Sequence, residues 1–305
     1  MAAHLSTLAW LGQPSPTGRP RHRPIPATSG VATVAALTHH QLAPTEEERA
    51  ALYAAYAREA ALAPDLAQPS PERLVLAALR LAWKGVPCYN TVKETLWRLA
   101  IHAVPGGRIP AAAWRCPCDL HGPPAPSSRL HSFWACPVAR AVRRQVALGL
   151  PPGAVVQRAD LWLLHPPAGA LGLCPRAWAL VALAALTAME HGRKYLWALR
   201  NSPEWPDPGP AGHVALARAL PNFIFPAHVR RHILAARDAL IQRVANAAAG
   251  HFWRTLHDFT LLHAVPPRRW ALTPAHPFLH VMPDGSLGLS LPAGVPAPPE
   301  EDDDL

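Results

Sequence analysis

Hydrophobic residues recur every three or four positions through most of the chain, which is the spacing of amphipathic helices. One such stripe is formed by Val92, Leu96 and Leu99. The pattern predicts helices that begin at Thr45 and at Asn90 or Thr91, and helices over residues 70–85, 137–148, 175–201, 214–220 and 227–262. The longest apolar run, inside 175–201, is shorter than the roughly 20 residues of a membrane span and indicates a buried helix.

Local signals mark where some of these helices begin or change direction. Thr45 with Glu48, and Thr91 with Glu94, have the spacing of a capping box, in which two side chains satisfy backbone N–H groups of the first turn. Gly250 lies inside the last helical pattern, and we expect it to break or bend that helix.

The C-terminal part changes from helical spacing to alternation. Residues 278–291 alternate around Asp284-Gly285, a dipeptide typical of hairpin turns. The predicted fold class is mainly α, a helical bundle-like array with a short C-terminal β-hairpin and disordered termini. The predicted domains are a disordered basic and proline-rich segment (1–44), a helical domain (45–201), a linker (202–212), a C-terminal helical region with the hairpin (213–292) and an acidic disordered tail (293–305).

The chain is basic. It has 29 Lys and Arg residues against 20 Asp and Glu residues, a formal net charge of +9. Lysine occurs only at Lys84, Lys93 and Lys194, so nearly all of the positive charge is arginine. Planar guanidinium groups suit phosphate, which makes nucleic acid a sensible partner class. The coding bias of a GC-rich genome would give the same composition, so both interpretations stay open.

The five cysteines are an odd number without a regular framework, which argues against a disulfide-stapled secreted protein. Cys116 with Cys118, and His131 with Cys136, form two close pairs joined by a Pro/Ser loop, the arrangement of a tetrahedral zinc site. His121 is a substitute ligand for one of the four. The predicted cofactor is therefore Zn²⁺, bound in a small knuckle within the helical array. The alternative is that the thiols are ordinary core residues and no metal binds.

Three arginines follow the cysteines on the helix predicted over 137–148. Arg140 lies three residues before Arg143 and four before Arg144, so the three share one helical face. A basic helix beside a zinc knuckle predicts contacts with the phosphates of a nucleic acid. A solvated face without a partner is the alternative.

The stretch CPC…LHSFWACPVARAV resembles the zinc-binding region that follows the polymerase core in non-LTR retrotransposon reverse transcriptases. The similarity is clearest from His131 through Cys136 to Pro137, and extends over about residues 90–201. The chain departs from the family in its Cys-x-Cys spacing, where the family has Cys-x-x-Cys. The resemblance implies a zinc ion held by both pairs, in a module that lies beside a catalytic core supplied by a separate polymerase chain of the retroelement.

The motifs of several common enzyme classes are missing. The chain has no Gly-rich phosphate loop, no His-Glu-x-x-His motif and no Gly-x-Ser-x-Gly elbow. Its aspartates are scattered, without the paired carboxylates of a polymerase palm. We therefore expect a non-catalytic, retrotransposon-derived zinc-binding protein fragment that contacts RNA or DNA backbone. The alternatives are a structural or protein-interaction scaffold that uses zinc only for stability, a decayed retroelement reading frame, and an enzyme of unrecognised type.

The N-terminal segment bears on location. No acidic residue precedes Glu46, and RPRHRP over residues 19–24 is a basic arm, which gives a faint resemblance to an organelle transit peptide. We expect an intracellular protein, nuclear or cytoplasmic, with organelle targeting as an alternative. Neither a membrane nor a small-molecule substrate is an expected partner.

Overall fold

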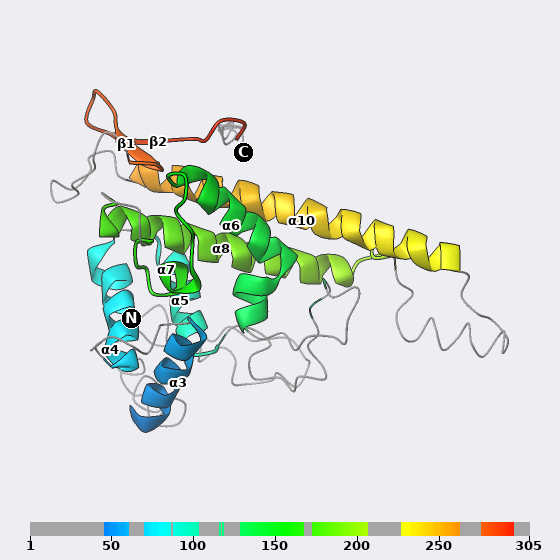
Figure 1. Cartoon of the computed structure of the whole chain (residues 1–305), viewed down its shortest axis with the longest axis horizontal. Helices are drawn as coiled ribbons and strands as arrows, with labels where there is room; N and C mark the ends of the chain where they lie inside the picture. The colour runs from blue at the N-terminus through cyan, green and yellow to red at the C-terminus, as the bar shows by residue number, and fades with distance from the viewer. Residues whose placement is uncertain are drawn as a thin grey trace, which may run out of the picture. The chain divides into compact units, whose positions relative to one another are not determined.

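The computed structural model describes residues 46–60, 70–86, 88–103, 116, 118, 129–167, 173–206, 227–262 and 276–295 (Figure 1). These residues are mainly helical, with one antiparallel β-hairpin near the C-terminus, which confirms the predicted fold class. The chain divides into two compact units, residues 1–51 and 52–305. Both predicted helical regions, 45–201 and 213–292, contribute helices to the second unit; the division between them at a linker stays a prediction.

The described elements are α3 (Glu46–Glu59), α4 (Pro71–Arg80), the π-helical turn η1 (Leu81–Gly85), α5 (Asn90–Ala100), the π-helical turn η2 (His131–Ala135), α6 (Pro137–Gly149), α7 (Arg158–Trp162), α8 (Pro175–Arg200), α10 (Ala227–Leu262), β1 (Leu279–Val281) and β2 (Leu287–Leu289). The helices predicted from periodicity are therefore confirmed, apart from 214–220, which lies outside the described residues. The short α7 was not predicted as a helix.

Proline and polar caps explain several helix starts. Pro71, Pro137 and Pro175 each stand in the first turn of a helix, where a missing N–H costs nothing. The capping box predicted at Thr91 is wrong. Helix α5 begins one residue earlier and has no side-chain cap, and Glu94 instead pairs with Arg98 on the next turn.

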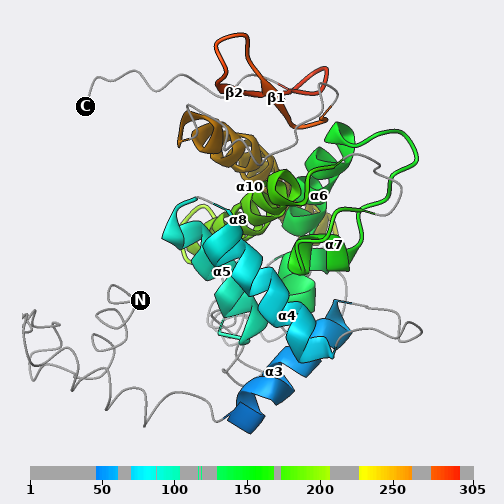
Figure 2. The same ribbon diagram turned by 90° about the vertical axis from the view of Figure 1, so that its left-hand side faces the viewer.

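Helix α8 is the centre of the core. Its residues from Ala177 to Leu186 are fully buried on every face, because α8 contacts α10, α6, α5 and α7. Figures 1 and 2 show α8 between α10 on one side and α5 on the other. A helix that is apolar all round can only be stable when it is surrounded in this way.

Helices α6, α8 and α10 meet at Gly192. A Cβ atom at this position would lie 2.5 Å from Cγ1 of Val138 and 2.7 Å from Cβ of Ala248. The absence of a side chain on α8 therefore sets how closely the other two helices approach. Gly250 of α10 behaves differently from its prediction, since α10 continues without a break through this residue.

The hairpin packs onto the helices through β2, which contacts α10, and through Phe278, the residue before β1. Strands β1 and β2 pair with Leu279 opposite Leu289, and Gly285 has the positive φ of +87° that the predicted turn requires. Phe278 is fully buried, with ring centroids of Trp178 and Trp253 at 6.3 and 6.2 Å. Phe278 thus attaches the start of the hairpin to aromatic side chains of α8 and α10.

A buried histidine begins the hairpin. Nδ1 of His276 accepts hydrogen bonds from the backbone N–H groups of Phe278 and Leu279, at 3.3 and 3.1 Å. Burial lowers the pKa of His276 to about 4, and an imidazole that accepts at Nδ1 is neutral. The fold thus holds this residue in one tautomer.

In the part of the chain that the structure describes, no helix is both long enough and apolar enough to cross a bilayer.

Substitution of Gly192 by alanine tests the three-helix contact. We expect Gly192→Ala to lower the free energy of unfolding by about 1–3 kcal/mol, because the added methyl group overlaps side chains of two other helices. Gly250→Ala is the matched control: its Cβ would meet nothing within 4 Å, and alanine favours the helix by about 0.5–1 kcal/mol. Urea unfolding of both variants measures the difference, and equal stabilities would contradict the proposed contact.

Candidate metal centre

The four side chains of the two predicted ligand pairs lie close together. The ligand atoms of Cys116, Cys118, His131 and Cys136 all lie within 4.8 Å of one another, in a group that could hold a metal ion. The Sγ of Cys136 is 4.0 Å from that of Cys116 and 3.6 Å from that of Cys118. The Sγ of Cys118 is 3.1 Å from Nε2 of His131. All three cysteines are free thiols and are buried.

A π-helical turn explains the five-residue spacing of His131 and Cys136. The backbone N–H of Cys136 donates to the carbonyl oxygen of His131 at 2.8 Å, across the wider turn of a π-helix. The two side chains therefore lie on one side of this turn. Single π turns occur often at functional sites.

Pro137 ends the π turn and starts α6. A residue that precedes proline is pushed into an extended conformation, and Cys136 has φ −56° and ψ 141°. Cys136 is thereby the N-cap residue of α6 and stands at the bend between two helical segments. The Cys-Pro dipeptide thus couples the direction of α6 to a ligand of the cluster.

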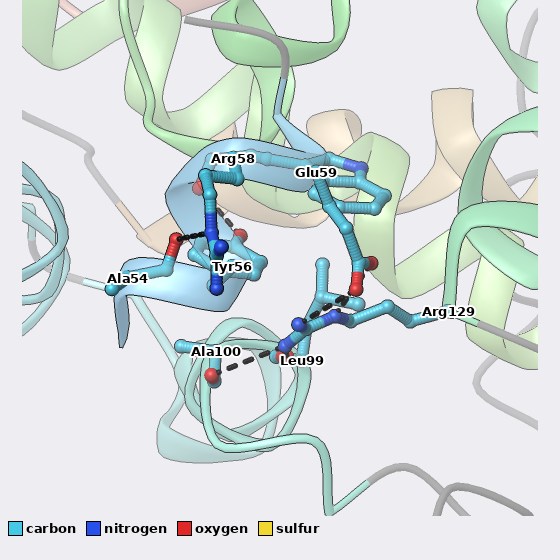
Figure 3. Close-up of polar contacts among 8 residues, drawn as sticks. Ala54, Tyr56, Arg58, Glu59, Leu99, Ala100 and Arg129 are labelled. Carbon is cyan, nitrogen blue, oxygen red and sulfur yellow. Dashed lines mark hydrogen bonds and ion pairs between the residues drawn. The ribbon is translucent and has the colours of Figure 1, made fainter. Parts of the chain in front are cut away.

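Arg129 anchors the segment that carries His131. Its side chain is 1% exposed, and it donates to both carboxylate oxygens of Glu59 on α3, at 2.8 and 3.0 Å. It also donates to the carbonyl oxygens of Leu99 and Ala100, at 3.1 and 3.3 Å (Figure 3). These carbonyls end α5, where a cation is favoured by the helix dipole.

Tyr56 of α3 completes this anchor. The Arg129 guanidinium lies over its ring at 5.3 Å, and its hydroxyl donates to the carbonyl oxygen of Trp162 at 2.6 Å. The rings of Tyr56 and Trp162 stack with centroids 5.4 Å apart. The network therefore holds the turn before His131 through α3, α5 and α7.

The thiols of the cluster differ in proton affinity. The pKa of Cys136 is well below its ordinary value, because hydrogen bonds with Cys116 and Cys118 favour its thiolate and outweigh burial. The pKa of Cys118 is raised by hydrogen bonds with Cys116 and Cys136 and by burial. For Cys116, the hydrogen bond with Cys118 lowers the pKa, but the bond with Cys136 and burial prevail and raise it to about 12. The group thus resembles one thiolate supported by two thiols.

The spacing fits a tetrahedral ion. Metal–sulfur bonds of about 2.3 Å at tetrahedral angles place two sulfurs about 3.8 Å apart, between the two observed sulfur separations. A metal–nitrogen bond of about 2.0 Å gives a sulfur–nitrogen separation of about 3.5 Å, so an ion would move Cys118 and His131 apart by about 0.4 Å.

The predicted phosphate-contacting arginines divide into two kinds. Arg140 and Arg144 are exposed on α6. Arg143 is half-buried: its guanidinium lies 3.8 Å from the centroid of the Trp134 ring and donates to the carbonyl oxygen of Trp134 at 3.1 Å. Burial, followed by the charges of Arg140 and Arg144, lowers the pKa of Arg143. Arg143 thus links α6 to η2 through its contacts with Trp134.

Two features of the site were not predicted from sequence. Arg129 has no local signal, because its partners are 70 and about 30 residues away. The π turn of η2 could have been suspected from the combination of a five-residue spacing with a following proline. His121, the predicted substitute ligand, lies outside the described residues.

The chain matches none of the protein-family models, curated proteins or solved structures with which it was compared. The retroelement resemblance of residues 90–201 therefore stays a prediction.

Removal of the anchor tests its role. We expect Arg129→Ala to lower the free energy of unfolding by about 2–4 kcal/mol, because it leaves two helix-end carbonyls and Glu59 without their donor. Arg58→Ala is the control, since Arg58 makes an exposed bond within its own helix, and we expect a change within about 0.5 kcal/mol. Denaturant unfolding compares the two, and a wild-type stability of Arg129→Ala would refute the anchor.

Proposed function

We propose that this chain is a non-catalytic, zinc-stabilised helical module that contacts the backbone of RNA or DNA. The observation that carries the proposal is the group of three buried cysteine sulfurs and the imidazole nitrogen of half-buried His131, all within 4.8 Å of one another. The two ligand pairs come from separate segments, and one of the ligands begins α6. An ion held there would fix the direction of a basic helix.

The donor set favours zinc. Thiolate and neutral imidazole are soft or borderline ligands, and a group of three cysteines with one histidine is a common structural zinc set. Four protein ligands leave no open coordination position for water or substrate, as in structural rather than catalytic sites. The role proposed for the ion is therefore stabilisation.

Zinc would also offset most of the negative charge that the three thiolates bring to the cluster. Binding requires Cys116 and Cys118 to lose their protons, so a divalent ion would be coordinated by three thiolates. Its affinity would fall as the pH falls, because protons compete for these sulfurs. The bound ion would link Cys116 and Cys118 to η2 and α6, so its binding free energy would contribute directly to folding.

The nucleic-acid contact is proposed for the face of α6 that bears Arg140 and Arg144. Both side chains are exposed, and neither forms an ion pair with a carboxylate in the described ranges. They lie one turn apart, so they can reach neighbouring phosphates of one strand. Arg143, which is tied to Trp134, would support this face without contacting phosphate.

An origin in a retroelement is part of the proposal. Its support is the similarity of residues 90–201 to the region beside a polymerase core, and the presence of both ligand pairs in one cluster. A separate polymerase chain would then be the natural protein partner.

Metal analysis of the purified protein tests the zinc site. We expect one zinc ion per chain in the wild type and none in Cys136→Ser or His131→Ala, with a loss of unfolding free energy of several kcal/mol in both variants. Cys174→Ser is the matched control, because Cys174 is also a buried free cysteine but lies outside the cluster. Wild-type protein that contains no zinc after growth in zinc-supplemented medium would sink the metal proposal.

Salt-dependent binding tests the nucleic-acid surface. We expect the double variant Arg140→Ala/Arg144→Ala to bind a 20-nucleotide single strand more weakly, and to lower the slope of log K against log salt by about 1–2, since each phosphate contact contributes roughly 0.7. The control is Arg73→Ala/Arg80→Ala, which removes two exposed arginines of α4 and the same charge. If both double variants bind alike, or if the wild type does not bind, zinc serves a scaffold without nucleic acid.

A further inference from the structure

A second cluster of titratable side chains lies where α8 and α10 pack together. His191 of α8 stacks on His251 of α10, with ring centroids 4.2 Å apart and ring planes 12° from parallel. His191 is exposed and His251 is half-buried, so the stacked pair reaches the surface. None of the proposed zinc ligands is part of this pair.

Each helix adds a cation three residues after its histidine. Lys194 follows His191 on α8, and Arg254 follows His251 on α10; both side chains are exposed. Residues three apart share one face of a helix, so each cation lies on the helical face that carries its histidine. The two helices thus present the same His-x-x-cation arrangement to one surface.

The carboxylates in this region do not balance these charges. Glu190 accepts two hydrogen bonds from Arg193, both at 2.8 Å, and its carboxylate lies 3.6 Å from Nζ of Lys194. One carboxylate is therefore shared between two cations. Arg254 forms no ion pair with any carboxylate that the structure describes.

The third helix at this junction places an apolar residue next to Gly192. The residue of α6 that meets α8 and α10 beside His191 is Val138, at the position of Gly192. The charges that lower the pKa of His191 are those of Arg254 and Lys194, and the charges that lower the pKa of His251 are those of His191 and Arg254.

Burial and the nearby cations both lower the pKa values of the two imidazoles. Burial, followed by the charges of Arg254 and Lys194, lowers the pKa of His191. Burial, followed by His191 and Arg254, lowers the pKa of His251 to about 4. A negative charge beside the pair would raise the pKa values of both histidines and favour their protonation.

We propose that His191, Lys194, His251 and Arg254 form a binding site for a tetrahedral oxyanion, that is, a phosphate group. Lysine and arginine supply the charge, and the imidazoles supply N–H donors that become stronger when protonated. This site goes beyond the proposed function, because it uses neither the zinc ligands nor the arginines of α6. The phosphate can belong to a nucleic-acid backbone or to a free phosphate compound, since both present the same oxygens.

Sulfate is the first probe, because it is a tetrahedral dianion whose charge does not change between pH 5 and 7.5. Its binding to the full-length protein is followed through the imidazole C–H signals of His191 and His251 in NMR spectra, assigned with His191→Asn and His251→Asn. We expect binding to be about fivefold tighter at pH 5 than at pH 7.5, because a bound anion raises the pKa of both histidines.

Charge-matched variants locate the site. We expect Lys194→Ala/Arg254→Ala to bind sulfate at least about tenfold more weakly than the wild type. The control Lys84→Ala/Arg231→Ala removes one exposed lysine and one exposed arginine elsewhere and leaves sulfate binding unchanged. Sulfate that shifts neither histidine, or that binds equally to both double variants, overturns the site.

Competition identifies the source of the phosphate. A 20-nucleotide single strand that displaces sulfate at concentrations where inorganic phosphate does not indicates a nucleic-acid backbone, and the reverse result indicates a free phosphate compound. Arg140→Ala/Arg144→Ala separates this site from the proposed function: it should retain the sulfate response even if it loses nucleic-acid binding. Conversely, loss of the sulfate response in that variant counts against an independent site.

Discussion

The close approach of three helices at Gly192 is the constraint on which both clusters depend. Because α8 has no side chain there, Val138 of α6 and Ala248 of α10 reach the same point. Val138 follows Cys136 by two residues, so the position of α6 is also the position of a proposed metal ligand. His191 precedes Gly192 directly, so the same approach brings it against His251. One packing contact therefore helps to position both the cysteine cluster and the histidine cluster.

The two clusters contrast in charge. The cysteine cluster collects thiol groups of which Cys136 is held as a thiolate, and it attracts a cation. The histidine cluster collects cations around neutral rings, and it attracts an anion. Perturbed groups of this kind concentrate at functional sites, although structural networks also produce them. Arg129 has a structural role instead: it is paired with Glu59 and two helix-end carbonyls, and it holds the segment before His131.

Periodicity and spacing were sufficient for the features that depend on nearby residues. The helices, the hairpin turn at Gly285 and the four-residue cluster all follow from patterns within short stretches. Several features that were missed depend on tertiary packing, which the local pattern does not show. Arg143 was grouped with its neighbours on α6, but its guanidinium lies over the half-buried ring of Trp134 from the preceding turn. Gly250 is a weak helix former in isolation, yet α10 continues through it because buried residues on either side, such as Ala248 and Phe252, hold the helix against the core.

The π turn at His131 constrains the number of residues between His131 and Cys136 more than the identities of those residues. Its closing hydrogen bond joins backbone atoms of His131 and Cys136, so it depends little on which side chains lie between them. Removal of one of these four intervening residues would leave an α-type turn and rotate Cys136 by about 100° away from the imidazole. Homologous chains that keep the cluster should therefore differ in the residue identities of this segment while they preserve its length. Distant relatives would be found by counting residues between the histidine and the Cys-Pro pair, where comparison of residue identities fails.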